Sequence, residues 1–147
     1  MKIQEKNYFF KLSKYQSQIR EAIVSETMKV VPESRKNEIL AVLDEGLEDI
    51  SFSRPYQGQA NAILVPGDET QAIYVWGDAL TNYISALGFG TANTSLFDEF
   101  WPEAVHLVGK DILRFHTLLW PAMLMNLDLP LPTTIYAHGF VNLEGRK

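Results

Sequence analysis

The sequence predicts an α/β protein, with a doubly wound parallel sheet preceded by a mainly helical amino-terminal segment. In the later part of the chain, three short runs of branched and aromatic residues alternate with two helical stretches, which is the strand-helix-strand order of a parallel sheet. In the earlier part, apolar residues recur at the spacing of amphipathic helices. We therefore expect two segments, residues 1–54 and 55–147, within one globular unit.

Four elements are expected in the amino-terminal segment and the stretch that follows it. Residues 13–16, Ser-Lys-Tyr-Gln, have the pattern of a capping box that starts a first helix. A second helix is expected after Pro32, and Gly46 supplies its left-handed stop. Residues 47–53 alternate between apolar and polar, which predicts a short strand with one solvent-exposed face. Residues 54–68, with two prolines and two glycines, are expected to form a loop.

The second part of the chain supplies the parallel sheet. Its three runs are apolar almost throughout, which is typical of strands buried on both faces. They are residues 72–76, 104–108 and 133–138. The stretches between them, residues 78–87 and 110–126, are long enough for helical crossovers. Pro121 lies inside the second stretch and should kink or interrupt it, because proline lacks the backbone N–H.

Composition excludes several classes of protein. The chain has 147 residues, 46% of them hydrophobic, so it can bury a core without a disulfide or a structural metal. It has no cysteine, and with three histidines we expect no zinc site in this chain. The net charge of −5 has the wrong sign for a surface that grips nucleic acid by itself. No apolar run is long enough to span a membrane, so we expect a soluble, cytoplasmic protein.

The carboxyl ends of the expected strands predict a ligand site. Ligands of open parallel sheets bind at this rim, where loops and helix amino termini converge. Residues 76–78, 109–111 and 138–140 each contain a glycine that permits close approach of a ligand. Three such ends indicate a site of nucleotide size. Taken alone, Asp78 or Asp111 is better explained as a helix cap than as a ligand-binding residue, and it is the convergence of the three ends that favours a site.

Aromatic and apolar residues recur at helical spacing beside this rim. They could line an apolar pocket with polar tips, although such stripes are more often ordinary core. His106 falls inside a strand and is expected to be structural. The sequence contains no nucleophile-histidine-acid arrangement, no His-x-x-x-His pair and no phosphate-binding loop. The residues of the stripes are Trp76, Ala79, Leu80 and Tyr83 on one stretch and Ile112, His116 and Trp120 on the next.

Several strings of residues resemble the methionyl-tRNA synthetases, a family of class I aminoacyl-tRNA synthetases. The most specific is residues 108–116, Val-Gly-Lys-Asp-Ile-Leu-Arg-Phe-His, followed by Trp-Pro-Ala at 120–122. Residues 74–83, Tyr-Val-Trp-Gly-Asp-Ala-Leu-Thr-Asn-Tyr, are similar to a second family signature, and residues 7–15 and 51–54 match the end of its connective insertion and the return to the catalytic domain. The resemblance runs from about Asn7 to Lys147.

This resemblance implies a ligase that activates methionine with ATP, assisted by Mg²⁺, and transfers it to tRNA(Met). The methionine side chain would be surrounded by Trp76, Ala79, Leu80, Tyr83, Ile112 and His116. The ATP ribose and adenine would be held by Gly109, Asp111, His138, Gly139, Phe140 and Val141. Neither step needs a protein nucleophile, since catalysis rests on positioning and on stabilising phosphate charge.

The chain also departs from the family pattern. Its first signature, His-Ile-Gly-His, is not present, and of the second, Lys-Met-Ser-Lys-Ser, only Lys147 would remain as a candidate catalytic lysine. The resemblance implies that residues 55–147 are the carboxyl-terminal half of the nucleotide-binding catalytic domain, ending at the start of that motif, and that the sheet is the second half of a doubly wound, Rossmann-type sheet. We expect the isolated chain to be inactive without the amino-terminal half. The alternative is a split or degenerate half-domain that acts as a protein-interaction or regulatory module.

Overall fold

Three strands far apart in the sequence form a parallel sheet in this computed structural model, which describes residues 6–141. They are β2 (Lys29–Val31), β7 (Val105–Gly109) and β8 (Thr134–His138), in the order β2-β8-β7. The strands at 105–109 and 134–138 confirm two of the three sequence predictions. β2 was not predicted, because three residues between two helices are too few to show a periodicity.

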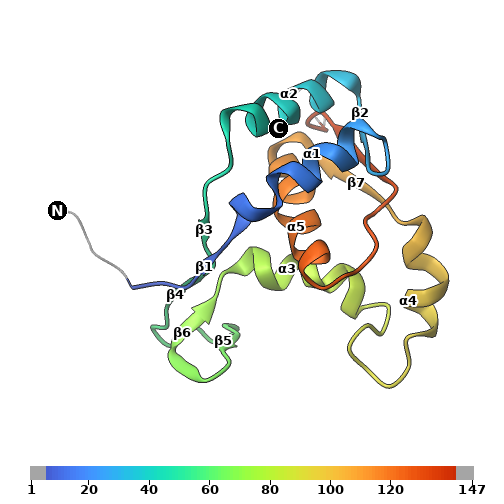
Figure 1. The fold of residues 1–147 in the computed structure, drawn as a ribbon. Coiled ribbons are helices and arrows are strands. Elements are labelled where there is room, and N and C mark those ends of the chain that lie inside the picture. Colours follow the sequence, from blue (N-terminus) through green and yellow to red (C-terminus); the bar gives the residue numbers. More distant parts are fainter. Residues whose placement is uncertain (1–5, 142–147) are drawn as a thin grey trace.

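The amino-terminal helices cover one face of this sheet (Figure 1). A 3₁₀ turn, Leu12–Tyr15, leads into α1 (Gln16–Val24), and α2 (Glu33–Glu45) follows β2. The helix ending at Gly46 is confirmed, with a φ of 101° at the glycine. The capping box was wrong: the hydroxyl of Ser13 donates to Asp49 over 2.6 Å, and the side-chain amide of Gln16 donates to the carbonyl of Leu43.

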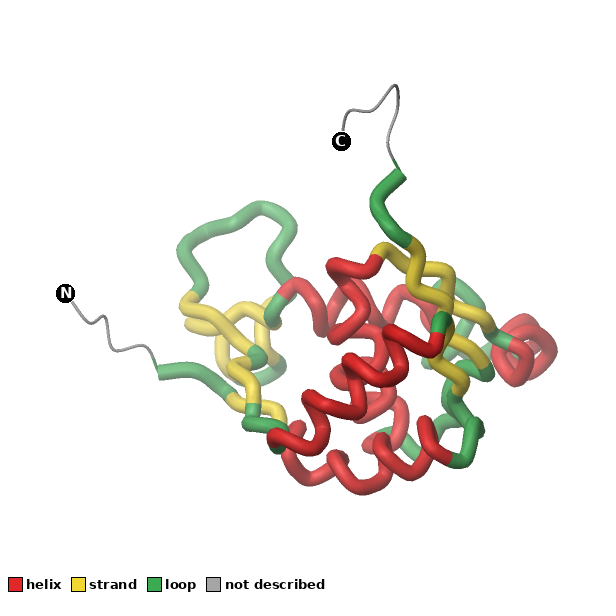
Figure 2. The backbone as a smooth tube through the Cα atoms, turned by 90° about the horizontal axis from the view of Figure 1, so that it is seen from above, coloured by secondary structure: helices red, strands yellow, loops and turns green. Residues whose placement is uncertain are grey.

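Short antiparallel strands form a second region, separated from the parallel sheet by helices (Figure 2). Here β1 (Phe9–Phe10) pairs with β3 (Ile50–Ser51), and β6 (Asp68–Ile73) lies between β4 (Ser53–Pro55) and β5 (Leu64–Val65). The parallel strand expected at 72–76 was therefore wrong. The chain leaves β6 at Ile73 and turns into a helix at Val75, so the apolar run 72–76 belongs to two elements.

Two further helices build the second hydrophobic cluster of the molecule. They are α3 (Val75–Ser85) and α4 (Ser95–Phe100), the latter continued by a 3₁₀ turn over Trp101–Glu103. Leu80 and Ile84 of α3 pack with Trp101 and with Trp120. Gly77 is buried in the first turn of α3, where a Cβ atom would lie 2.7 Å from Cζ of Phe52.

The stretch at 110–126 is helical throughout but changes its type. A 3₁₀ turn (Lys110–Ile112) is followed by a π-helical segment (Phe115–Leu119) and by α5 (Trp120–Asn126). Pro121 lies in the first turn of α5, and the wider π turn lies directly before it. Because Pro121 has no N–H to give to the carbonyl of Thr117, the expected irregularity occurs here without ending the helix.

The outer face of the parallel sheet is exposed in the part of the chain that the structure describes. Val105 and Leu107 of β7 are 60% and 70% exposed, and Tyr136 of β8 is 45% exposed. The inward residues His106 and Ile135 are buried. The expectation of strands buried on both faces was therefore wrong: the helices around this sheet cover one face only, and the doubly wound arrangement remains a prediction.

The two segments expected from the sequence share this sheet. Val30 from the first segment is in register with Ile135 of the second, and α1 packs in one core with α5. The boundary at residue 54 stays a prediction. None of the helices between residues 6 and 141 has the length and apolarity needed to cross a membrane.

Candidate functional site

The carboxyl ends of β7 and β8 lie side by side. Gly109 is in register with His138, so the two residues that follow the strands, Lys110 and Gly139, also start from the same rim. A Cβ atom on Gly109 would lie 2.6 Å from Oδ1 of Asp111. The glycine therefore makes room for the Asp111 carboxylate, although its own φ of −67° is ordinary. Two of the three predicted strand ends thus meet as expected.

The segment after β8 is held to the end of β7 by a cation-π contact. The ammonium of Lys110 lies 4.7 Å from the ring centroid of Phe140. Nδ1–H of His138 donates to the carbonyl of Gly139 over 2.6 Å. Val141 is 84% exposed. The last predicted residue, Lys147, lies outside the described residues.

The third predicted strand end is organised differently. Trp76 lies in the first turn of α3, which follows an antiparallel strand, and Asp78 is exposed on the same helix. The Trp76 ring stacks on Phe115 of the π segment, with centroids 4.0 Å apart. It meets the ring of His116 edge-on at 6.2 Å. Helix packing, not a shared strand rim, therefore brings Trp76 to His116.

Tyr83 and His116 form the polar end of this aromatic cluster. The Tyr83 hydroxyl and Nε2 of His116 are 2.9 Å apart, and Nδ1 of His116 is 2.9 Å from the carbonyl oxygen of Ile112. His116 is 1% exposed, and its burial lowers its pKa. Burial likewise raises the pKa of Tyr83. Both groups are therefore neutral near pH 7, so the cluster offers hydrogen bonds without charge.

The other predicted methionine-site residues are not all placed alike. Ala79 is exposed and Ile112 is half-buried. Leu80 is 1% exposed and packs in the core behind the aromatic rings. Phe115, which sequence reasoning did not single out, is the stacking partner of Trp76; its position directly before His116 was the available signal.

A second layer of rings lies behind Tyr83 and His116. His106 is 6% exposed, and its ring centroid is 4.3 Å from that of Tyr83 and 5.7 Å from that of His116. The indole N–H of Trp120 donates to Nε2 of His106 over 3.1 Å. His106 thus supports the cluster from the core, as expected for a structural histidine in a strand.

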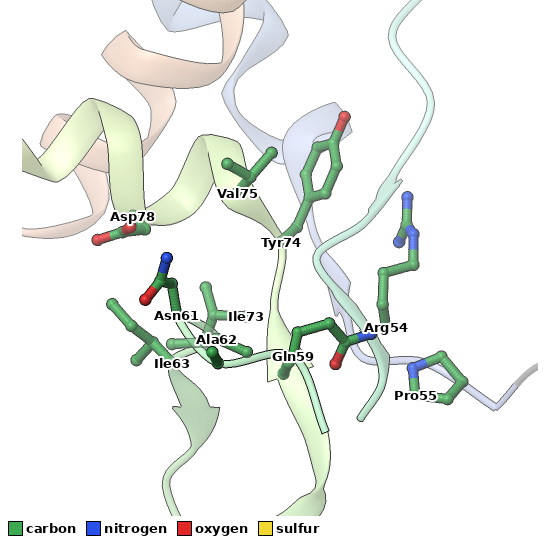
Figure 3. A pocket seen from close by; sticks show the side chains of 12 residues that line it. Arg54, Pro55, Gln59, Asn61, Ala62, Ile63, Ile73, Tyr74, Val75 and Asp78 are labelled. Atoms are coloured by element: carbon green, nitrogen blue, oxygen red, sulfur yellow. The ribbon is translucent and has the colours of Figure 1, made fainter. Parts of the chain in front are cut away.

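A separate cavity of about 510 Å³ lies at the start of α3. Its lining includes Arg54, Asn61, Ile63, Val75 and Asp78, and Figure 3 shows Arg54 and Asp78 on opposite sides of it. None of the predicted methionine- or ATP-binding residues lines it. Within residues 6–141, no three histidine or carboxylate side chains converge into a metal site.

The parallel sheet with its Gly-Lys-Asp rim and the aromatic helix cluster beside it belong to an α/β protein. The sequence profile of one family, described as tRNA synthetases class I (M), matches residues 1–147. The chain therefore belongs to the class I tRNA synthetases.

Its relatives define the branch of that family. The methionine–tRNA ligase of Oceanobacillus iheyensis is 47% identical over 146 residues, and that of Clostridium acetobutylicum is 49% identical over 147 residues. These matches cover 99% of this chain but 21% and 22% of the relatives. The chain thus spans about a fifth of the length of these relatives.

A solved structure agrees in fold as well as in sequence. The methionyl-tRNA synthetase of Mycobacterium tuberculosis bound by methionyl-adenylate superposes with a TM-score of 0.86 at 40% identity, covering 94% of this chain and 27% of that one. Its apo form gives a TM-score of 0.87. The α/β fold of the segment is therefore that of its family.

Proposed function

We propose that the chain is a segment of a methionine–tRNA ligase and supplies part of the site that forms methionyl-adenylate and transfers the methionyl group to tRNA. One observation carries this proposal: Trp76 and Tyr83 of α3 meet His116, which lies on the helical stretch that continues from the Gly109–Asp111 rim. An amino-acid side chain and a nucleotide can therefore be held side by side. The similarity to a Mycobacterium tuberculosis methionyl-tRNA synthetase bound by methionyl-adenylate supports the proposal.

The aromatic cluster suits a thioether. A flexible, apolar sulfur-containing chain is best read by aromatic walls, with sulfur-aromatic contacts of about 0.3 to 1.5 kcal/mol each. Trp76 and Tyr83 provide these walls, Ala79 and Ile112 border them, and His116 sets the polar end. Leu80 would act from beneath, because its side chain packs into the core.

The rim suits a nucleotide. Gly109 leaves room for the Asp111 carboxylate, which is exposed and can accept ribose hydroxyls. Backbone groups at 138–141 can read an adenine edge. Mg²⁺ would arrive with the ATP phosphates, which is its usual mode of binding. It supplies charge stabilisation for the phosphates. Lys147 remains the proposed lysine on the phosphate side.

The exposed surface of the parallel sheet offers a place for the expected amino-terminal half of the catalytic domain to pack. In the described part of the chain, β7 has a neighbouring strand on one side only, and its outer face carries Val105 and Leu107. Sheets of this class bury both faces. We propose that the amino-terminal half of the catalytic domain completes the sheet, and that the complete ligase works in the cytoplasm. No observation favours a separate interaction module.

A chimera tests this function. We would replace the matching segment of the Clostridium acetobutylicum ligase with this chain and measure methionine-dependent ATP–pyrophosphate exchange. Trp76→Ala should raise the KM for methionine about tenfold or more, since it removes an aromatic wall. The matched control is Phe100→Ala, an exposed aromatic residue on α4.

Three outcomes are decisive. Equal methionine kinetics for Trp76→Ala and the parent chimera would contradict the pocket assignment. An equal loss with Phe100→Ala would point to a general effect on folding. The isolated chain should give no exchange, and robust exchange by it would contradict the need for the amino-terminal half.

A further inference from the structure

Lys110 is the first residue after β7, and its side chain reaches across to the segment that follows the neighbouring strand. It opens the 3₁₀ turn Lys110–Ile112, and the pairing of Gly109 with His138 places it beside the end of β8. Its ammonium group lies 4.7 Å from the centroid of the Phe140 ring, two residues beyond β8. Lys110 is half-buried, as expected for a long side chain that lies along the protein surface.

Within residues 6–141, the structure pairs this ammonium group with the Phe140 ring and with no carboxylate. The neighbouring Asp111 carboxylate turns back over Gly109, whose Cβ position is 2.6 Å from its Oδ1 atom. A cation over an aromatic face is attracted by the ring quadrupole. The contact therefore ties the end of β7 to the chain that leaves β8.

The Phe140 ring belongs to the stretch 138–141, whose backbone groups are proposed to read the adenine edge. This stretch begins at the last residue of β8, and Phe140 itself is 47% exposed. Backbone groups hydrogen-bond a ligand best when they are already in position, because ordering a segment on binding costs affinity. A contact that holds Phe140 in place would order this stretch before ATP arrives.

We propose that Lys110 is a positioning residue for ATP, which acts through the Phe140 ring and not on the nucleotide itself. This inference rests on the proposed function, because it assumes that residues 138–141 border the adenine. Two successive residues of one turn then serve the nucleotide differently. Asp111 contacts the ribose, and Lys110 holds the segment on the other side of the rim.

The test measures the KM for ATP and the KM for methionine in the chimera described above. Lys110→Gln removes the cation, and Phe140→Leu removes the aromatic face but stays apolar. Each variant should raise the KM for ATP about two- to fivefold and leave the KM for methionine unchanged. Lys110→Arg keeps a cation that can lie over the ring, so it should stay close to the parent. The matched control is Arg114→Gln, at an exposed cation one turn further on, which should leave the KM for ATP unchanged.

The double variant Lys110→Gln/Phe140→Leu separates positioning from a direct contact with ATP. If Lys110 acts through Phe140, the double variant should lose no more than the more affected single variant. If the ammonium group touched the ATP phosphates, the two effects would multiply, and that result overturns the inference. An unchanged KM for ATP in Lys110→Gln, or an equal rise in the KM for methionine, overturns it as well.

A second measurement needs neither the chimera nor a substrate. In the NMR spectrum of this chain, the ring current of Phe140 should shift the ε-methylene protons of Lys110 upfield, and Phe140→Leu should abolish that shift. Random-coil positions in the parent chain would overturn the contact. Trp76→Ala tests the methionine pocket alone, so a failure of the proposed pocket and a failure of this inference give different results.

Discussion

The indole N–H of Trp120 donates to Nε2 of His106 across the buried layer between α5 and β7, over 3.1 Å. Tryptophan can only donate, so Nε2 of His106 must be unprotonated. Burial, reinforced by His116, lowers the pKa of His106 to about 4. The neutral ring is therefore part of the folded structure, and protonating it would break the contact with Trp120.

Stability should depend on pH through this residue. The unfolded histidine, with a pKa near 6.5, binds more protons than the folded one between about pH 6.5 and pH 4. The stabilisation that comes from the neutral His106 ring is fully present above that range and is lost as the pH falls through it. We expect His106 to contribute a loss of about 2 kcal/mol between pH 7 and pH 5, measured by urea unfolding.

The control for this prediction keeps the acceptor but removes the titration. His106→Gln can still accept from Trp120, so the loss between pH 7 and pH 5 should be smaller in this variant. The lowered pKa of His116 acts in the same direction and would remain. An identical pH dependence in the parent and in His106→Gln would show that His106 is not the group responsible.

Gly109 should control the use of ATP. Gly109→Ala would place a Cβ atom 2.6 Å from Oδ1 of Asp111 and displace that carboxylate from the rim. In the chimera we expect a KM for ATP roughly tenfold higher, since a carboxylate hydrogen bond contributes about 1.5 to 3 kcal/mol. The matched change Gly139→Ala meets no atom within 4 Å and should have the smaller effect. Equal effects at both glycines would contradict the positioning of Asp111 by Gly109.

Gly77 should tolerate no large side chain while Phe52 is present. Gly77→Leu would overlap the Phe52 ring, 2.7 Å from the Cβ position, and the methyl group of Ile73 at 3.0 Å. Overpacking of this kind costs about 1 to 3 kcal/mol, which urea unfolding of the isolated chain would measure. Phe52→Ala should restore part of the loss in the double variant. A double variant that is destabilised by the full sum of both changes would argue against the contact.

The exposed face of β7 should make the isolated chain self-associate. Leu107 is 70% exposed beside Val105, and such patches drive association until a partner covers them. Leu107→Lys should shift the sedimentation profile toward the monomer. The control is Leu96→Lys, at a leucine of α4 that is 50% exposed outside the sheet face. The same shift with both variants would mean that the sheet face is not the contact surface.

The parts of the fold that could be predicted are the elements whose own residues carry the signal for a helix or a strand. The helix ending at Gly46 and the strands at 105–109 and 134–138 carry their own periodicity and stop signals. The prediction of a strand at 72–76 was wrong because apolarity does not reveal where a strand ends and a helix begins. Pairing with β4 and β5 sets the end of β6 at Ile73. Ser13 matched a capping box locally, but its hydroxyl donates a hydrogen bond to Asp49, 36 residues away.

The candidate site shows the same limit. Gly109 and His138 could be placed together because parallel strands share a rim. Spacing alone put Leu80 on the face of Trp76, whereas tertiary packing turns Leu80 into the core. The 2.9 Å contact between Tyr83 and His116 joins two helices, and no sequence pattern reports it.

The edge strand β2 has a consequence for how this polypeptide folds. Residues 29–31 lie on the amino-terminal side of the irregular stretch at 56–63, yet they complete a sheet whose other strands come more than seventy residues later. Cutting the chain near residue 54 would separate the edge strand β2 from β8 and β7. The two sequence segments should therefore melt in one cooperative transition, and hydrogen exchange should protect the amides of β2 and β8 equally.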